Sequence, residues 1–575
     1  MRIYIRAGIL TTVLLIRPQA QTADSASDKD YRAGMNAMQN GDSASAAQDF
    51  RRAIAANPRN ADAQNALGQL LLQQHKASEA VEHLRAVTRL KPSLAIAHLY
   101  LGQALSQNGT TDEAVSEFRI TVRLAPNQAQ AHEALARALV SQQKTSEALV
   151  EMSKAVELAP NQPEYHDELG SLQAQSKAYS AAEDQFRAAL SLNSSYEPAL
   201  LHLGVALLQD GKLADAKAAL ESASQLSPDD GLAHYYLGNV LEGVQNSGSA
   251  LKEYKDAVKL LPDFMPLRTR LGVLAQRTGD ITTAIECFRA VVAAQPNDPE
   301  AHNNLGLALL QSGKADEAIP EMETAIRYAP KDSSYRNNLG AAYLQKSDFD
   351  AAIDQYKKGL AISPDNPELH YNLGLALKLK DDLPAATAEL QKTIALDPSL
   401  PDPRYTLGII YWQSGKFDEA AKQLNEVIRL KPDYAEAYYT LGTVYKQAEN
   451  WPGAAQALRK AIELQPDFAG AHTTLAAVLR QQGDAQGAAA ESKLGAELTQ
   501  AKMSQQAAQF ATNSGTKLLN AGDLEGAIAQ FESAISHDQN YAPAHQQLAT
   551  ALERKGDKAR AAKEMQIAQQ LLAKQ

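Results

Sequence analysis

The sequence predicts an all-α fold made of repeated helix pairs, and three observations support this prediction. A small residue follows leucine or another apolar residue every 34 residues along most of the 575-residue chain. Between these markers apolar residues recur at three- and four-residue spacing, which is typical of one helix face, and almost no alternating strand pattern occurs. Glycine and proline stand where these segments end. One pair cannot bury its own apolar side, so the pairs must stack.

The unit at residues 300–330 shows why each repeat holds two helices. Asp298 and Pro299 are typical of the cap and the first residue of a helix, and the apolar residues that follow predict a first helix. Gly313 favours the left-handed conformation that ends this helix. A second apolar face follows, and Pro330 ends the second helix. We call the two helices of each unit helix A and helix B.

The small residue of this unit marks fourteen units in a row without an insertion. Its copies are Gly34, Gly68, Gly102, Ala136, Gly170, Gly204, Gly238, Gly272, Gly306, Gly340, Gly374, Gly408, Gly442 and Ala476. An alanine stands twelve residues after each of them. Glycine within a helix costs about 1 kcal/mol relative to alanine, so its recurrence predicts that two helices approach closely at this point.

These positions together resemble a known repeat. The pattern W-x2-L-G-x2-Y, A-x3-F and P over 34 residues is that of the tetratricopeptide repeat, and one unit matches it through Leu441, Gly442, Tyr445, Ala454, Ala461 and Pro466. The resemblance covers nearly the whole chain and implies about sixteen repeats. It also implies a right-handed superhelical solenoid of antiparallel helix pairs, in which helix A lines a concave groove.

The register of the repeats predicts the domain organisation. Residues 27–488 form fourteen contiguous repeats, whereas the next matches, at Gly515 and Ala549, come five residues late. Residues 489–509 contain no proline, so we interpret them as an extended helix or linker; a loop insertion is the alternative. Residues 510–575 then form two further repeats.

The amino terminus stands outside the repeats. Residues 1–23 resemble a secretory signal peptide, because Arg2 and Arg6 precede the apolar run Ala7–Ile16 and a small, polar segment follows. The run is too short to span a bilayer and no cysteine follows it, so we expect no stable membrane anchor. The prediction is an exported protein, periplasmic or secreted, if the segment is cleaved; the alternative is a cytoplasmic protein.

Charge and cysteine content narrow the classes of partner. The formal net charge of -11 argues against nucleic acid, which requires a basic surface. Cys287 is the only cysteine, which excludes an intrachain disulfide, and the apolar residues around it predict a packed thiol. The resemblance to the tetratricopeptide repeat implies that the partners are proteins or peptides.

The sequence carries no pattern that predicts catalysis. Eight histidines share one repeat position, four residues before the small residue: His98, His132, His166, His234, His302, His370, His472 and His545. Helices pack about 8–10 Å apart, so equivalent rings cannot share one metal ion, and we interpret them as filling a structural slot. Walker, dinucleotide-binding, HExxH and GxSxG motifs are absent. We predict no enzyme, no cofactor and no metal.

A candidate peptide-binding groove follows from the resemblance. In the family, the residue two before the small residue points into the groove, and three adjacent units place asparagine there. A carboxamide donates and accepts, so such a row can hydrogen-bond an extended peptide backbone; the alternative is that asparagine is simply the commonest residue in that slot. A tyrosine row and a tryptophan lie close by, and aromatic side chains are enriched at binding hot spots. The candidate residues are Asn304, Asn338, Asn372, Tyr371, Tyr405, Tyr439 and Trp412.

The function predicted from these observations is a non-enzymatic protein-interaction scaffold that binds extended peptides. One alternative is a periplasmic or envelope accessory factor for polysaccharide secretion or envelope assembly, a role that exported arrays of this kind often have in bacteria. A glycan ligand is open as well, because tyrosines can also stack on sugar rings. Another is a regulatory or substrate-holding arm of a separately encoded enzyme.

Overall fold

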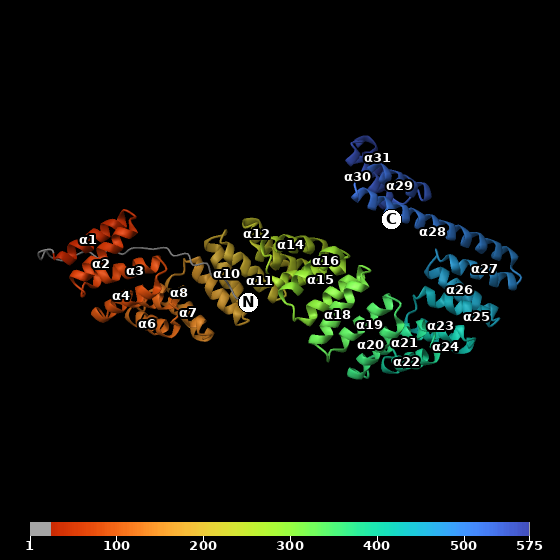
Figure 1. Ribbon diagram of the computed structural model, residues 1–575, viewed down its shortest axis with the longest axis horizontal. Helices are drawn as coiled ribbons and strands as arrows, with labels where there is room; N and C mark the ends of the chain where they lie inside the picture. The colour runs from red at the N-terminus through yellow and green to blue at the C-terminus, as the bar shows by residue number, and fades with distance from the viewer. Residues whose placement is uncertain (1–24, 574–575) are drawn as a thin grey trace. The chain divides into compact units, whose positions relative to one another are not determined.

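The computed structural model describes residues 25–573, and all regular secondary structure in that range is helical (Figure 1). Its 31 helices alternate as helix A and helix B, which confirms the predicted all-α helical-repeat solenoid. The predicted signal peptide at residues 1–23 lies outside the described residues. Within the described range, no helix is both long and apolar enough to cross a membrane.

The described residues divide into two compact units, with the boundary inside α16, between Cys287 and Phe288. In the first unit, successive helices pack against one another. Its A helices are α1 (Ala26–Gln39), α3 (Ala61–Gln73), α5 (Ala95–Gln107), α7 (Ala129–Ser141), α9 (Pro163–Gln175), α11 (Glu197–Gln209), α13 (Gly231–Gly243) and α15 (Met265–Thr278). Its B helices are α2 (Ser43–Ala56), α4 (Ala77–Leu90), α6 (Thr111–Leu124), α8 (Thr145–Leu158), α10 (Tyr179–Leu192), α12 (Leu213–Leu226), α14 (Ser247–Leu260) and the start of α16 (Ile281–Ala294).

The second unit continues the same alternation. Its A helices are α17 (Pro299–Gln311), α19 (Ser333–Gln345), α21 (Pro367–Leu379), α23 (Pro401–Gln413), α25 (Ala435–Gln447), α27 (Ala469–Gln481) and α30 (Ala542–Lys555). Its B helices are α18 (Ala315–Tyr328), α20 (Phe349–Ile362), α22 (Leu383–Leu396), α24 (Phe417–Leu430), α26 (Trp451–Leu464), α29 (Leu524–His537) and α31 (Lys558–Leu572). One further helix, α28 (Ala485–Asn520), serves as both types.

The helix ends follow the residues that predicted them. The Asp298 carboxylate accepts a hydrogen bond from the Glu300 amide at 2.9 Å, and Pro299 is the first residue of α17. The helix ends at Gln311, and Gly313 has a φ of 79°, in the left-handed region. The turn from helix A to helix B is therefore encoded locally.

The recurring glycine permits the close approach of the two helices in a pair. A Cβ atom at Gly340 would lie 2.5 Å from Cε1 of Tyr356, a side chain that is 1% exposed. At Gly102 it would lie 2.5 Å from Cε1 of Phe118. The large side chain of helix B occupies the position that a Cβ atom would take, which confirms the predicted close packing.

The region after Ala488 is one continuous helix. α28 is 36 residues long, packs against α27 near its start and against α29 near its end, and includes residues 489–509. It provides helix B of the fourteenth pair and helix A of the fifteenth, which is why sixteen pairs need only 31 helices. The register shift after Ala488 therefore comes from a continuous helix and not from a loop insertion. The division into domains stays a prediction.

Candidate functional site

The repeated histidines connect their own helix pair to the end of the preceding one. His302 is 7% exposed; its Nδ1 lies 2.5 Å from Glu321 Oε2 on helix B, and its Nε2 lies 2.9 Å from the Pro296 carbonyl oxygen. The same two contacts, to a glutamate on helix B and to the carbonyl of the proline that ends the preceding unit, recur at His98, His132, His234, His370 and His472.

These contacts determine what the histidines can do. A carbonyl oxygen only accepts, so Nε2 donates to it, and Nδ1 lies against the glutamate carboxylate. Both ring nitrogens contact other groups of the protein and are not available to a metal ion. These contacts support the structural interpretation of the histidines.

A row of side-chain hydrogen bonds joins the A helices of the second unit. Each hydrogen bond joins two adjacent repeats. One partner stands three residues before the small residue of its repeat, and the other stands two residues before the small residue of the next repeat. Asn338 Nδ2 donates to Asn303 Oδ1 at 2.9 Å, and Asn372 Nδ2 donates to Asn337 Oδ1 at 2.8 Å. We call this row, which starts at Asn303, the helix-A ladder.

The helix-A ladder continues with tyrosine and threonine in place of asparagine. The Tyr405 hydroxyl lies 3.1 Å from Thr440 Oγ1, and Tyr371 and Thr406 occupy the same two repeat positions one unit earlier. Burial raises the pKa of Tyr371. Side-chain hydrogen bonds thereby join α17 to α19, α19 to α21, and α23 to α25.

The predicted asparagines keep hydrogen-bonding groups that the ladder does not use. Asn338 and Asn372 each use one N–H, and each keeps a second N–H and the carbonyl oxygen. Within the described residues Asn304 has no side-chain hydrogen bond and is only partly buried. Each of the three can still offer a donor and an acceptor, which are the two groups that a peptide unit requires.

The predicted aromatic residues are all half-buried on the same A helices. The ring of Tyr405 lies 5.3 Å from that of Tyr434, and the ring of Tyr439 lies 4.7 Å from that of Phe468. Trp412 donates from Nε1 to Gln447 Oε1 at 2.6 Å. All seven predicted residues thus lie on consecutive A helices, but their role in binding stays a prediction.

A charged group on α7 and α9 was not predicted from the sequence. Arg137 lies between two carboxylates: its Nη1 is 2.5 Å from Glu133 Oε1, and its Nε donates to Glu168 Oε2 at 3.0 Å. Burial raises the pKa of Glu133 to about 7, although the positive charge of Arg137 acts to lower it. Beside this group, Asp167 Oδ1 lies 2.8 Å from His202 Nδ1.

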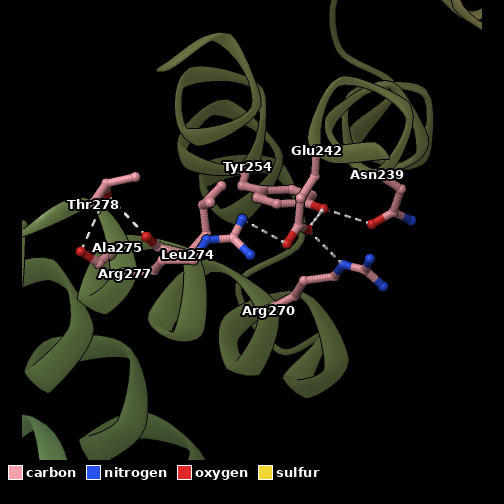
Figure 2. A network of polar contacts seen from close by, with 8 residues as sticks. All are labelled: Asn239, Glu242, Tyr254, Arg270, Leu274, Ala275, Arg277 and Thr278. Carbon is pink, nitrogen blue, oxygen red and sulfur yellow. Dashed lines mark hydrogen bonds and ion pairs between the residues drawn. The ribbon is translucent and has the colours of Figure 1, made fainter. Parts of the chain in front are cut away.

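A second unpredicted group consists of one acid and two arginines. Glu242 of α13 accepts from Arg270 Nε at 3.1 Å and from Arg277 Nη2 at 3.1 Å, and both arginines belong to α15 (Figure 2). The Tyr254 hydroxyl lies 3.1 Å from Glu242 Oε2 and 2.7 Å from Asn239 Oδ1. One carboxylate thus holds two guanidinium groups.

These contacts share a spacing that the sequence could have revealed. Asn303 with Asn338 and Asn337 with Asn372 are separated by 35 residues, as are Asp167 with His202 and Glu242 with Arg277. This is one repeat plus one residue. Complementary polar residues at this separation therefore indicate contacts between adjacent A helices.

The fold and its side-chain contacts define a class: a helical-repeat protein whose A helices carry rows of polar and aromatic side chains. The tetratricopeptide repeat family model matches residues 31–95, 65–129, 99–163, 133–198, 201–263 and 512–574, together more than half of the chain. The chain belongs to the tetratricopeptide repeat family. A model of the C-terminal domain of cilia and flagella-associated protein 70 matches residues 246–512.

The chain is also similar to several solved structures. MamA is 30% identical over 29% of this chain and 96% of its own, with a TM-score of 0.28. YrrB, described as a TPR protein with an unusual peptide-binding site, is 26% identical over 33% of this chain and 97% of its own, with a TM-score of 0.29. Yeast Tom70 is 17% identical over 74% of this chain and 96% of its own, with a TM-score of 0.37. No curated protein matches the chain by sequence comparison.

Proposed function

We propose that the protein is a non-enzymatic interaction scaffold that binds an extended peptide along the A helices of its second unit. Tetratricopeptide repeats typically serve as protein-interaction surfaces, which supports the general assignment. The observation that carries the specific proposal is the helix-A ladder, in which Asn338 and Asn372 are fixed by intramolecular bonds and still offer a donor and an acceptor.

The mechanism of binding follows from these groups. Each carboxamide is oriented by its bond to the preceding helix, so a ligand need not order it, and the entropy cost of binding is reduced. The adjacent A helices present such groups in a row, which suits the repeating N–H and C=O groups of an extended backbone. Tyr371, Tyr405 and Tyr439 provide apolar contact beside that row.

The test compares variants of the full chain on a random peptide library, followed by fluorescence anisotropy with the selected peptides. The triple variant Asn338→Ala, Asn372→Ala, Tyr405→Ala should weaken binding by about tenfold or more, since several hydrogen bonds and an aromatic contact are lost. Peptides with N-methylated backbones should bind weakly to the wild type. The control variant Gln391→Ala, Asn425→Ala changes similar side chains on helices B and should bind as the wild type does.

Two results would contradict the proposal. One is equal peptide affinity for the triple variant and the wild type. The other is selective retention of oligosaccharides on a glycan array that depends on Tyr405, which would favour the sugar-binding alternative and a role in envelope or polysaccharide assembly.

A further inference from the structure

We propose that Arg270 and Arg277 form a second binding site, for an oxyanion carried by a partner peptide, either a carboxylate or a phosphoryl group. The site lies on α13 to α15 in the first unit and is independent of the ladder in the second unit. The argument rests on geometry, on the count of charges and on a contrasting arginine in the same unit.

The two arginines are placed side by side by the helix. They are seven residues apart, close to two turns of α15, so they point from the same face. Val273 lies between them on that face and is 44% exposed. Figure 2 shows the two guanidinium groups on either side of the Glu242 carboxylate, with the terminal nitrogens of Arg270 directed away from it.

The Glu242 carboxylate, which accepts from both arginines, is itself held in place by Tyr254. Tyr254 is fully buried, and its hydroxyl contacts both Glu242 and Asn239. Burial by itself raises the pKa of Glu242, but the hydrogen bond and the charge of Arg270, together with Tyr254 and Arg277, outweigh it and lower that pKa. Glu242 is therefore ionised at neutral pH and orients both arginines before any ligand arrives.

The group formed by Arg270, Arg277 and Glu242 carries one more positive charge than negative charge. Two guanidinium groups face one carboxylate, and within the described residues neither terminal nitrogen of Arg270 has a carboxylate partner. The side chains of Arg270 and Arg277 are 47% and 56% exposed. A planar guanidinium presents parallel N–H groups that match the two oxygens of a carboxylate or phosphoryl group.

Arg137 provides the contrast. Its Nη1 and Nη2 face Glu133 and Glu168, and its Nε also donates to Glu168, so two carboxyl groups occupy one guanidinium and no positive charge is left over. An arginine on this face is thus not in itself an anion site. What distinguishes α15 is the ratio of two arginines to one acid.

The experiment uses the full chain and three fluorescein-labelled peptides that differ only in their central residues: glutamate, phosphoserine or alanine. At low ionic strength, anisotropy should show binding of the charged peptides but not of the alanine peptide, and added salt should weaken it. Arg270→Gln and Arg277→Gln should each raise the Kd by about tenfold, and Arg270→Lys, which keeps the charge but loses the fork, should raise it less.

Matched controls make the result decisive. Arg119→Gln removes the same charge from a half-exposed arginine on α6 and should leave the Kd within about twofold of the wild type, because Arg119 is paired with Glu147 and lies outside α13 to α15. The triple ladder variant should also leave it unchanged, which separates this site from the proposed function. Circular dichroism verifies that each variant is folded.

The relative affinities of the glutamate and phosphoserine peptides identify the source of the oxyanion. The proposal is overturned if neither charged peptide binds the wild type, if the alanine peptide binds as well as they do, or if Arg119→Gln loses as much affinity as Arg270→Gln and Arg277→Gln.

Discussion

At the scale of single residues, one position of helix A holds different residues with different contacts in different repeats. The position three residues before the small residue holds Asn303 and Asn337 in the ladder, Tyr371 and Tyr405 further on, and the buried acid Glu133 in the first unit. The small residue itself has one duty throughout, which is to leave space for helix B.

A substitution of that glycine tests this duty. Gly340→Ala should destabilise the protein by about 1–3 kcal/mol, since the added methyl group would overlap the buried Tyr356 ring, and this strain exceeds the helix propensity gained. Gly248→Ala in α14 is the matched control, because nothing lies within 4 Å of the added Cβ, and it should stabilise by up to about 1 kcal/mol. Urea unfolding measures both, and two shifts of the same sign would contradict the account.

The buried acid Glu133 predicts a dependence of stability on pH. Its pKa in the folded protein is about 7 and thus above the ordinary value of 4.5, so the folded state binds the proton more tightly than the unfolded state. The stability from this proton is complete below pH 4.5 and is lost as the pH rises to about 7. The loss is on the order of 3 kcal/mol, at about 1.4 kcal/mol per pH unit.

Glu133→Gln should therefore flatten the curve of unfolding free energy against pH between about 4.5 and 7. Glu113→Gln, at an exposed acid on α6, should leave the slope as in the wild type. Equal slopes for the wild type and the Glu133 variant would show that Glu133 does not titrate in this range.

At the scale of elements, α28 differs from every other helix. Most side chains between residues 489 and 506 are exposed, so this stretch depends on its own hydrogen bonds and on helix-favouring alanine, glutamine and lysine rather than on packing. The helices on either side of it are instead covered by neighbours.

The exposed middle of α28 should be sensitive to proline. Gln500→Pro removes a backbone donor and costs about 3 kcal/mol locally, which should open the helix and permit rapid tryptic cleavage after Lys502. Gln500→Ala should remain as resistant as the wild type. Mass spectrometry of the fragments provides the measurement, and equally fast cleavage in all three proteins would contradict a stable helix here.

At the scale of the whole molecule, stability spreads along the chain, because each helix pair contacts mainly its neighbours in sequence. Separate surfaces can then evolve on separate repeats without disturbing one another. The uncharged ladder of the second unit and the arginine pair of the first are two such surfaces.

The destination of the protein is also a property of the whole chain, and we propose export on the basis of the sequence of residues 1–23. Expression of the complete gene product in a bacterium, followed by cell fractionation and intact-mass measurement, should give a periplasmic or secreted protein that lacks about the first 20 residues. An uncleaved protein in the cytoplasmic fraction would favour the cytoplasmic alternative.

The sequence by itself determined the helix pairs, their number and their caps, because residues such as Asp298, Gly313 and Gly340 act through local backbone geometry and contact within one repeat. It also placed Asn338 and Tyr405 on the correct helices. Only the tertiary structure decided that Asn338 binds Asn303, that Arg137 is saturated by two acids and that Arg270 is not. Those pairings depend on how adjacent A helices are offset when they stack, and this offset is a property of packing that no single repeat contains.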